Sequence, residues 1–312
     1  MPAKARPSGN VLKVKTGSPI STHNTCPNFA MTSPLAPPPP TMLAQPLRNL
    51  AAWTAYLRSA EIPVLAETAE ALEALRLNED DVDANSIGEM IAGDPLMTLK
   101  VLAYASANRS ARMVTDVETV TSALVMMGIS PFFRAFGVQP MVEERLAKFP
   151  DALTGLQETL RRAYRAANFA LAFAVHRMDN DAPVIHAAAL LHDFAEMLLW
   201  CHAPTLAMQI REAQRADPTL RSSAAQLGAL NIELTDLQQA LMKAWRLPEL
   251  LVRISNDRHS DHPSVRSVTL ALRLARHTSQ GWDNLAIPDD VLEIATLLNL
   301  SEANALQFVK AV

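Results

Sequence analysis

Glycine is scarce in this chain. It has 9 glycines in 312 residues, where an average usage of about 7% would give roughly 22. Sheet proteins with many tight turns need glycine for backbone conformations with positive φ. A glycine-poor chain that is rich in Ala and Leu therefore favours helices packed on helices. We predict an all-α fold with a substantial core, since 49% of the residues are hydrophobic.

Cysteines and long apolar runs are also few. The two cysteines, Cys26 and Cys201, suggest no disulfide framework, and Cys201 is interpreted as a small core residue. No run of 18 or more uninterrupted apolar residues occurs, so we expect no membrane span. Basic residues near the N-terminus are not followed by an apolar signal segment. We predict a cytoplasmic protein.

A long basic run is absent as well, and the net charge is −4. A protein that holds nucleic acid through its phosphates usually presents a clustered face of Lys and Arg. Arg161, Arg162 and Arg165 form one small cluster, which we interpret as a solvated helix face. A DNA-binding regulator is a third hypothesis for the function, and the mild acidity argues against it.

The first 45 residues differ in composition from the rest. Ser, Thr, Asn and Pro dominate residues 1–45, and Pro37 to Pro40 are four consecutive prolines. Such a segment cannot bury enough apolar surface to offset the entropy of ordering it. We predict a disordered tail that acts as a spacer, with a proline-rich partner motif as the alternative.

Helical periodicity begins near Leu47. We predict a helical domain over residues 46–262, made of two lobes at about 46–148 and 149–262, with C-terminal helices at 263–312 packed on it. Asp94-Pro95 is a helix-start signal, and Thr115 or Asp116 would cap a helix that ends at Gly128. Other helices are expected at 152–177, 182–202, 204–215, 221–230, 234–245, 248–257, 263–278, 289–298 and 301–311. The helix at 182–202 is apolar on nearly all sides, which is typical of a central helix.

Several segments resemble the HD-related output domain (HDOD) family. Residues 87–102, IGEMIAGDPLMTLKVL, are similar to the family's Asp-Pro segment, and residues 62–65, IPVL, to its opening. Residues 123–128, ALVMMG, residues 187–193, AAALLHD, and residues 244–248, AWRLP, are similar to three later segments. The resemblance covers about residues 55–262. It implies a helical bundle related to metal-dependent HD phosphohydrolases that acts as a signalling or regulatory module.

The resemblance also implies what a metal site would need: an upstream His, the His-Asp doublet and a distant Asp. Here His192-Asp193 supplies the doublet. The upstream ligand should fall near residues 164–168, where the chain reads YRAAN, and no His occurs between His23 and His176. Arg165 at that place would repel a divalent cation. Asp236 lies near where the distant Asp could fall, and we interpret it as a surface acid.

We therefore predict no catalytic residue, no bound metal and no cofactor. His192 and Asp193 are the residual candidates for metal ligands, and Arg165, His192, Asp193 and Asp236 form a degenerate site with a structural role. His186 is interpreted as structural or exposed. His259, Asp261 and His262 form a second polar cluster, interpreted as a solvated loop.

The favoured hypothesis is a non-catalytic module of bacterial signalling that binds a protein partner. The alternative is a metal-dependent HD phosphohydrolase that acts on a nucleotide or a cyclic dinucleotide. The two differ in the number of metal ligands, and the sequence supplies too few for the second. We expect no membrane and no nucleic acid among the partners.

Overall fold

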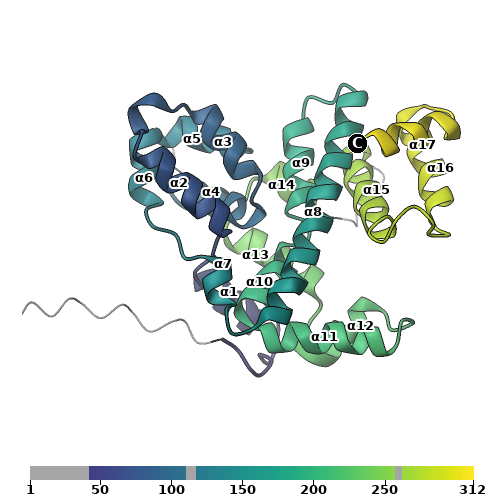
Figure 1. The fold of residues 1–312 in the computed structure, drawn as a ribbon, viewed down its shortest axis with the longest axis horizontal. Helices are drawn as coiled ribbons and strands as arrows, with labels where there is room; N and C mark the ends of the chain where they lie inside the picture. The colour runs from purple at the N-terminus through teal and green to yellow at the C-terminus, as the bar shows by residue number, and fades with distance from the viewer. Residues whose placement is uncertain (1–41, 110–116, 257–261) are drawn as a thin grey trace, which may run out of the picture. The chain divides into compact units, whose positions relative to one another are not determined.

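The computed structural model describes residues 42–109, 117–256 and 262–312, and this part of the chain is built from helices without a strand (Figure 1). The all-α prediction is confirmed. Of the predicted tail, residues 1–41 lie outside the described ranges.

The helices of the first half are α1 (Leu50–Ser59), α2 (Ala66–Arg76), the 3-10 turn η1 (Glu79–Asp81), α3 (Ala84–Ala92), α4 (Pro95–Ala107), α5 (Val120–Met127), α6 (Ile129–Ala135), α7 (Val142–Arg145) and α8 (Pro150–His176). Those of the second half are α9 (Ala182–Leu190), α10 (Phe194–His202), α11 (Pro204–Ala216), α12 (Ser222–Leu230), α13 (Leu234–Ala244), α14 (Glu249–Ile254), α15 (Pro263–His277), α16 (Ile287–Leu298) and α17 (Glu302–Ala311).

Buried apolar side chains form two clusters. The small core draws on residues 64–136 and is built mainly by helices α2 to α6. The large core runs from Trp53 to Val309. Because Trp53 and Leu57 of α1 belong to the large core, the division between the cores does not follow residue 148. The two predicted lobes and the domain boundaries stay a prediction.

The Asp94 side chain hydrogen-bonds both to the start of α4 and to the segment before α2. Its Oδ1 accepts the backbone N–H groups of Leu96 and Met97 at 2.8 and 3.1 Å, which satisfies two free donors at the helix start. Its Oδ2 accepts the N–H of Leu65 at 2.9 Å. Asp94 is fully buried, so the predicted helix-start signal is confirmed and also has a tertiary role.

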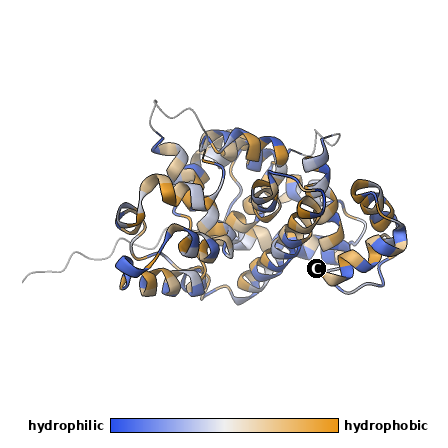
Figure 2. Ribbon diagram, turned by 90° about the horizontal axis from the view of Figure 1, so that it is seen from above, coloured by the Kyte–Doolittle hydropathy of each residue, from blue (hydrophilic) through white to orange (hydrophobic). Residues whose placement is uncertain are grey.

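Helix α8 lies at the centre of the large core. It is 27 residues long and packs against α9 and α15. Pro150 occupies its first turn, where a missing N–H costs nothing. Figure 2 shows orange apolar and blue polar stretches alternating along the helices, as expected for helices that each bury one face.

The predicted helix over residues 182–202 is wrong in one respect, because the structure divides it. Helix α9 ends at Leu190, and α10 begins at Phe194. By length and composition Ala182–His202 could cross a membrane, but 78% of the window tested is buried inside the structure. Both helices are mostly buried, so the apolar character belongs to the large core.

The N-terminal cap of α5 also differs from expectation. Thr119 is the cap: its hydroxyl accepts the N–H of Ser122 at 3.1 Å in a reciprocal capping box. Thr115 and Asp116, the predicted caps, lie outside the described residues. Gly128 ends the helix as predicted, with a φ of +80° that L-amino acids rarely adopt.

Candidate functional site

The His192-Asp193 doublet lies in the turn that separates α9 from α10. Asp193 stands at the N-cap position of α10, yet its side chain accepts no capping hydrogen bond there. Instead Asp193 Oδ1 lies 3.1 Å from Nδ1 of His192. The break in the apolar segment thus directs the carboxylate away from its own helix and toward α8.

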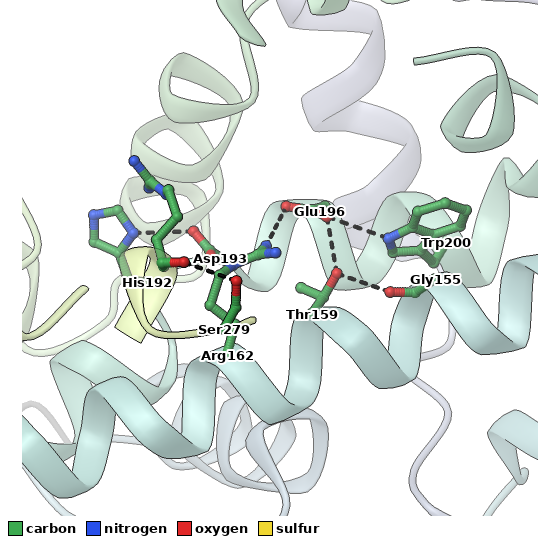
Figure 3. Close-up of polar contacts among 9 residues, drawn as sticks. Gly155, Thr159, Arg162, His192, Asp193, Glu196, Trp200 and Ser279 are labelled. Atoms are coloured by element: carbon green, nitrogen blue, oxygen red, sulfur yellow. Dashed lines mark hydrogen bonds and ion pairs between the residues drawn. The ribbon is translucent and has the colours of Figure 1, made fainter. Parts of the chain in front are cut away.

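Arg162 of α8 occupies the space beside the doublet. Its Nε donates to Asp193 Oδ2 at 3.1 Å, and its Nη2 donates to Glu196 Oε2 at 2.9 Å (Figure 3). The guanidinium therefore bridges the carboxylate of the α10 N-cap residue, Asp193, and that of Glu196 in the first turn of α10. Charge-assisted hydrogen bonds of this kind are among the stronger polar contacts in proteins. We call Arg162, His192, Asp193 and Glu196 the ion-pair network.

The network continues along α8 through Glu196. Glu196 Oε1 accepts the hydroxyl of Thr159 at 2.8 Å and lies 3.4 Å from Nε1 of Trp200. The Thr159 hydroxyl is also 3.1 Å from the carbonyl oxygen of Gly155 (Figure 3). The polar groups between α8 and α10 are thereby linked in one connected arrangement, which fixes these helices against each other.

Charge stabilises the network at neutral pH. Burial alone would raise the pKa of Asp193, but the hydrogen bond with His192 and the positive charge of Arg162 hold it well below its ordinary value. Burial likewise opposes the charge on Arg162, but the carboxylates of Glu196 and Asp193 raise its pKa. Both the carboxylate and the guanidinium are therefore ionised.

These residues do not fit a metal ion. Within the described ranges, no three His, Cys, Asp or Glu side chains come together in a way that could hold one. The guanidinium of Arg162, at 3.1 Å from Asp193 Oδ2, carries a positive charge where a divalent cation would need oxygen or nitrogen lone pairs. We derive no metal-dependent step from this arrangement.

A cleft of about 490 Å³ opens beside the network. Its lining includes Arg162, His192 and Asp193 together with two further arginines, Arg211 and Arg276. Arg211 lies over the ring of Trp200, with 5.6 Å between the guanidinium carbon and the ring centroid. The cleft thus combines cations with carboxylates, so charge alone does not favour one sign of ligand.

The structure places the other predicted site residues elsewhere. Arg165 donates to the carbonyl oxygen of Thr278 at 2.9 Å and lies over Phe169 and Trp282, so Arg162 and not Arg165 faces the doublet. Asp236 is exposed on α13 and does not line the cleft.

The remaining polar candidates fall partly outside the described residues. His259 and Asp261 lie in the range 257–261, which the structure does not describe, while His262 caps α15. His186 is partly buried on α9, where burial lowers its pKa.

The interpretation of the arginine cluster as a solvated helix face needs correction. Arg161 is exposed, but Arg162 and Arg165 are partly buried and hydrogen-bonded. A helix turns by about 100° per residue, so neighbours in sequence face different surroundings. The signal for Arg162 was its position two residues before the expected ligand region, together with the acidic residue Glu196 after the doublet.

Cys201 and His202, beside the network in sequence, are buried in the large core. Burial raises the pKa of the Cys201 thiol to about 12 and lowers the pKa of His202 to about 3. Arg145 Nη2 lies 3.0 Å from Nδ1 of His202 and can only donate, so Nδ1 accepts and Nε2 carries the hydrogen. The interpretation of Cys201 as a core residue agrees with its burial.

The comparisons with known proteins point to one family. The family model of the HDOD domain matches residues 62–261. No curated protein matches the chain.

Two solved structures share the fold. The MmoQ response regulator from Methylococcus capsulatus str. Bath is 19% identical with a TM-score of 0.61, and the match covers 80% of this chain and 98% of that one. A virulence factor from Campylobacter jejuni subsp. jejuni is 16% identical with a TM-score of 0.54, and the match covers 82% of this chain and 97% of that one. At these identities the likeness is one of fold.

Proposed function

This chain belongs to the HDOD family, and from that premise we propose that it is a non-catalytic signalling module that acts by binding a protein partner. The proposal includes a cytoplasmic location. The alternative, a metal-dependent phosphohydrolase acting on a nucleotide or cyclic dinucleotide, needs a site that can hold a divalent cation. Fold likeness alone does not separate the two, because one fold can carry many activities.

One observation supports the proposal above the others: the contacts of Arg162. Its guanidinium lies within hydrogen-bonding distance of both Asp193 and Glu196. A side chain that keeps its positive charge at all ordinary pH values thereby neutralises the doublet from inside the protein. The pair would have to be broken before a metal could bind. That exchange would leave a partly buried arginine without a partner, which is costly.

The first experiment tests for metal and hydrolysis. Purified full-length protein is analysed for bound metals and assayed with cyclic dinucleotides and nucleoside phosphates in the presence of Mg²⁺ or Mn²⁺. We expect metal well below one equivalent and no turnover above buffer. Stoichiometric metal together with hydrolysis that is lost in His192→Ala would refute the proposal and favour the phosphohydrolase.

The second experiment tests for a partner. The wild-type chain serves as bait beside Arg162→Met, which disrupts the ion-pair network, and Arg161→Met, an exposed position one residue away. We expect a protein retained by the wild type and by Arg161→Met to be weakened with Arg162→Met. A bait lacking residues 1–41 then shows whether the proline-rich segment contributes. No difference among the baits would contradict a role for the network in binding.

A further inference from the structure

A second cleft, of about 470 Å³, lies between helices of the two cores. One side comes from α2 and the end of α3, and the other comes from α8 and α9, whose positions can be followed in Figure 1. None of its lining residues lines the first cleft. The two clefts are therefore separate sites, and an argument about one does not depend on the other.

Three polar side chains from the large-core side line this second cleft: Tyr164 and Asn168 of α8 and His186 of α9. None of their side chains makes a hydrogen bond to another residue in the described part of the chain. Tyr164 and His186 are partly buried. Asn168 is exposed, and the polar atoms of Tyr164 and His186 remain accessible to solvent, so all three groups are available to a ligand.

The charge around the cleft has one sign. No lysine or arginine belongs to the lining, whereas Glu67, in the first turn of α2, lies exposed at its edge. Burial raises the pKa of Tyr164, and the nearby carboxylates of Asp94 and Glu67 add to this effect. Glu67 is the carboxylate that lines the cleft, whereas Asp94 lies outside the lining and burial raises its own pKa. A ligand with a negative charge is disfavoured here, and one with a positive charge is favoured.

Apart from Thr68, whose side chain hydrogen-bonds with Asp94, the remaining walls are small or apolar. Small residues leave space on both sides of the cleft, at Ala71, Ala92, Gly93 and Ala167. Leu65, Met90 and Leu190 supply apolar surface. Apolar walls with a few convergent polar groups are the usual character of small-molecule sites.

We propose that this cleft binds a small organic cation, with its ammonium group beside Glu67 and Tyr164 and its apolar part against Met90 and Leu190. His186 and Asn168 are placed to hydrogen-bond any further polar group on the ligand. Such a molecule contacts helices of both cores at once. Its binding therefore restrains the small core relative to the large one, a change that a partner protein could detect.

The test uses three probes of similar size and different charge: benzylamine, benzyl alcohol and benzoate. Affinity for the full-length protein is measured by NMR titration of the backbone amides. We expect benzylamine to bind up to about fivefold more tightly than benzyl alcohol, since a charge contact with an exposed carboxylate contributes at most roughly this much. We expect no binding of benzoate. Equal affinity for the amine and the carboxylate would overturn the proposal.

Variants locate the binding. Glu67→Gln and Tyr164→Phe should each weaken benzylamine binding about fivefold, whereas Glu70→Gln, an exposed acid on the same helix that does not line the cleft, should leave it unchanged. Ala71→Leu should abolish binding by filling the cleft. Glu67 is exposed, so Glu67→Gln leaves the fold intact even if the larger side chain at residue 71 does not. Unchanged affinity in Glu67→Gln would overturn the proposal.

Discussion

A β-carbon placed on Gly155 would lie 2.5 Å from Cη2 of Trp200. This distance is shorter than any normal carbon–carbon contact, so the indole ring of α10 rests directly on the backbone of α8. Alanine normally stabilises a helix interior relative to glycine by about 1 kcal/mol. At position 155 the close contact with Trp200 should make alanine destabilising relative to glycine.

Gly155→Ala should therefore destabilise the protein. Adding a methyl group to a packed contact lowers the free energy of unfolding by about 1–3 kcal/mol. This loss exceeds the gain from the better helix propensity of alanine. The free energy of unfolding in urea gives the measurement. Gly228→Ala is the matched control, because this glycine lies in α12 with no heavy atom within 4 Å of the added β-carbon. It should stabilise the protein by about 0.5–1 kcal/mol, and a gain at residue 155 would contradict the packing described.

Arg162→Met should destabilise the protein by roughly 2–3 kcal/mol at pH 7, because two partly buried carboxylates lose their counter-charge. The pKa of Asp193 lies below its ordinary value of 3.8 in the folded protein. Its contribution to stability is thus present above about pH 4 and is lost as the pH falls below that. The loss of stability caused by Arg162→Met should therefore become smaller as the pH falls below about 4.

The control for this prediction is Arg161→Met, at an exposed position of α8, which should change stability by less than about 0.5 kcal/mol. The triple variant Arg162→Met, Asp193→Asn and Glu196→Gln should be more stable than Arg162→Met alone, since it also removes the two unpaired negative charges. Chemical denaturation at pH 7, 5 and 3 measures all four proteins. An equal penalty at every pH would show that Arg162 acts through packing alone.

His202 should make the protein acid-sensitive. Burial lowers its pKa from 6.5 to about 3 in the folded protein. Between these values the unfolded chain binds a proton that the folded protein does not, so the free energy of unfolding falls as the pH decreases, by up to about 1.4 kcal/mol per pH unit. Stability measured between pH 7.5 and 4 tests this. His202→Gln should reduce the change in the free energy of unfolding per pH unit. His176→Gln, at an exposed position of α8, should leave this pH dependence unchanged.

Cys201 should resist thiol reagents while the protein is folded. The side chain is fully buried, and burial raises the thiol pKa to about 12, so almost no thiolate exists at pH 8. In a Cys26→Ser background, labelling with an aromatic disulfide reagent should be slow in buffer and complete in denaturant. Fast labelling in buffer would show that the α10 region opens readily.

The sequence predicted most of the helices, because caps and prolines act locally. Asp94-Pro95, Pro183 and Gly128 lie at helix boundaries as expected. The break between α9 and α10 was not predicted, because an apolar run carries no local sign of where it bends. The turn at residues 191–193 places Asp193 against Arg162 of α8, a tertiary contact that periodicity within one segment cannot reveal.

The candidate site was predicted only in part for a related reason. The doublet His192-Asp193 could be found as a pattern, but its partner could not, because Arg162 and Arg165 are three residues apart and either could face α10. Their surroundings decide between them: Arg165 lies over Trp282 and donates to Thr278, both contributed by a loop more than 100 residues later. Contacts between segments so distant in sequence depend on how the whole helical core assembles.

The two cores also differ in when they can form during synthesis. The small core needs only residues 64–136, so all of its members are synthesised in the first half of the 312 residues. The large core includes Trp53 and Val309, and it cannot close fully until residue 309 has been synthesised. Until then the apolar segment Ala182–His202 lacks some of its final neighbours, so the growing chain exposes apolar surface that is prone to aggregation.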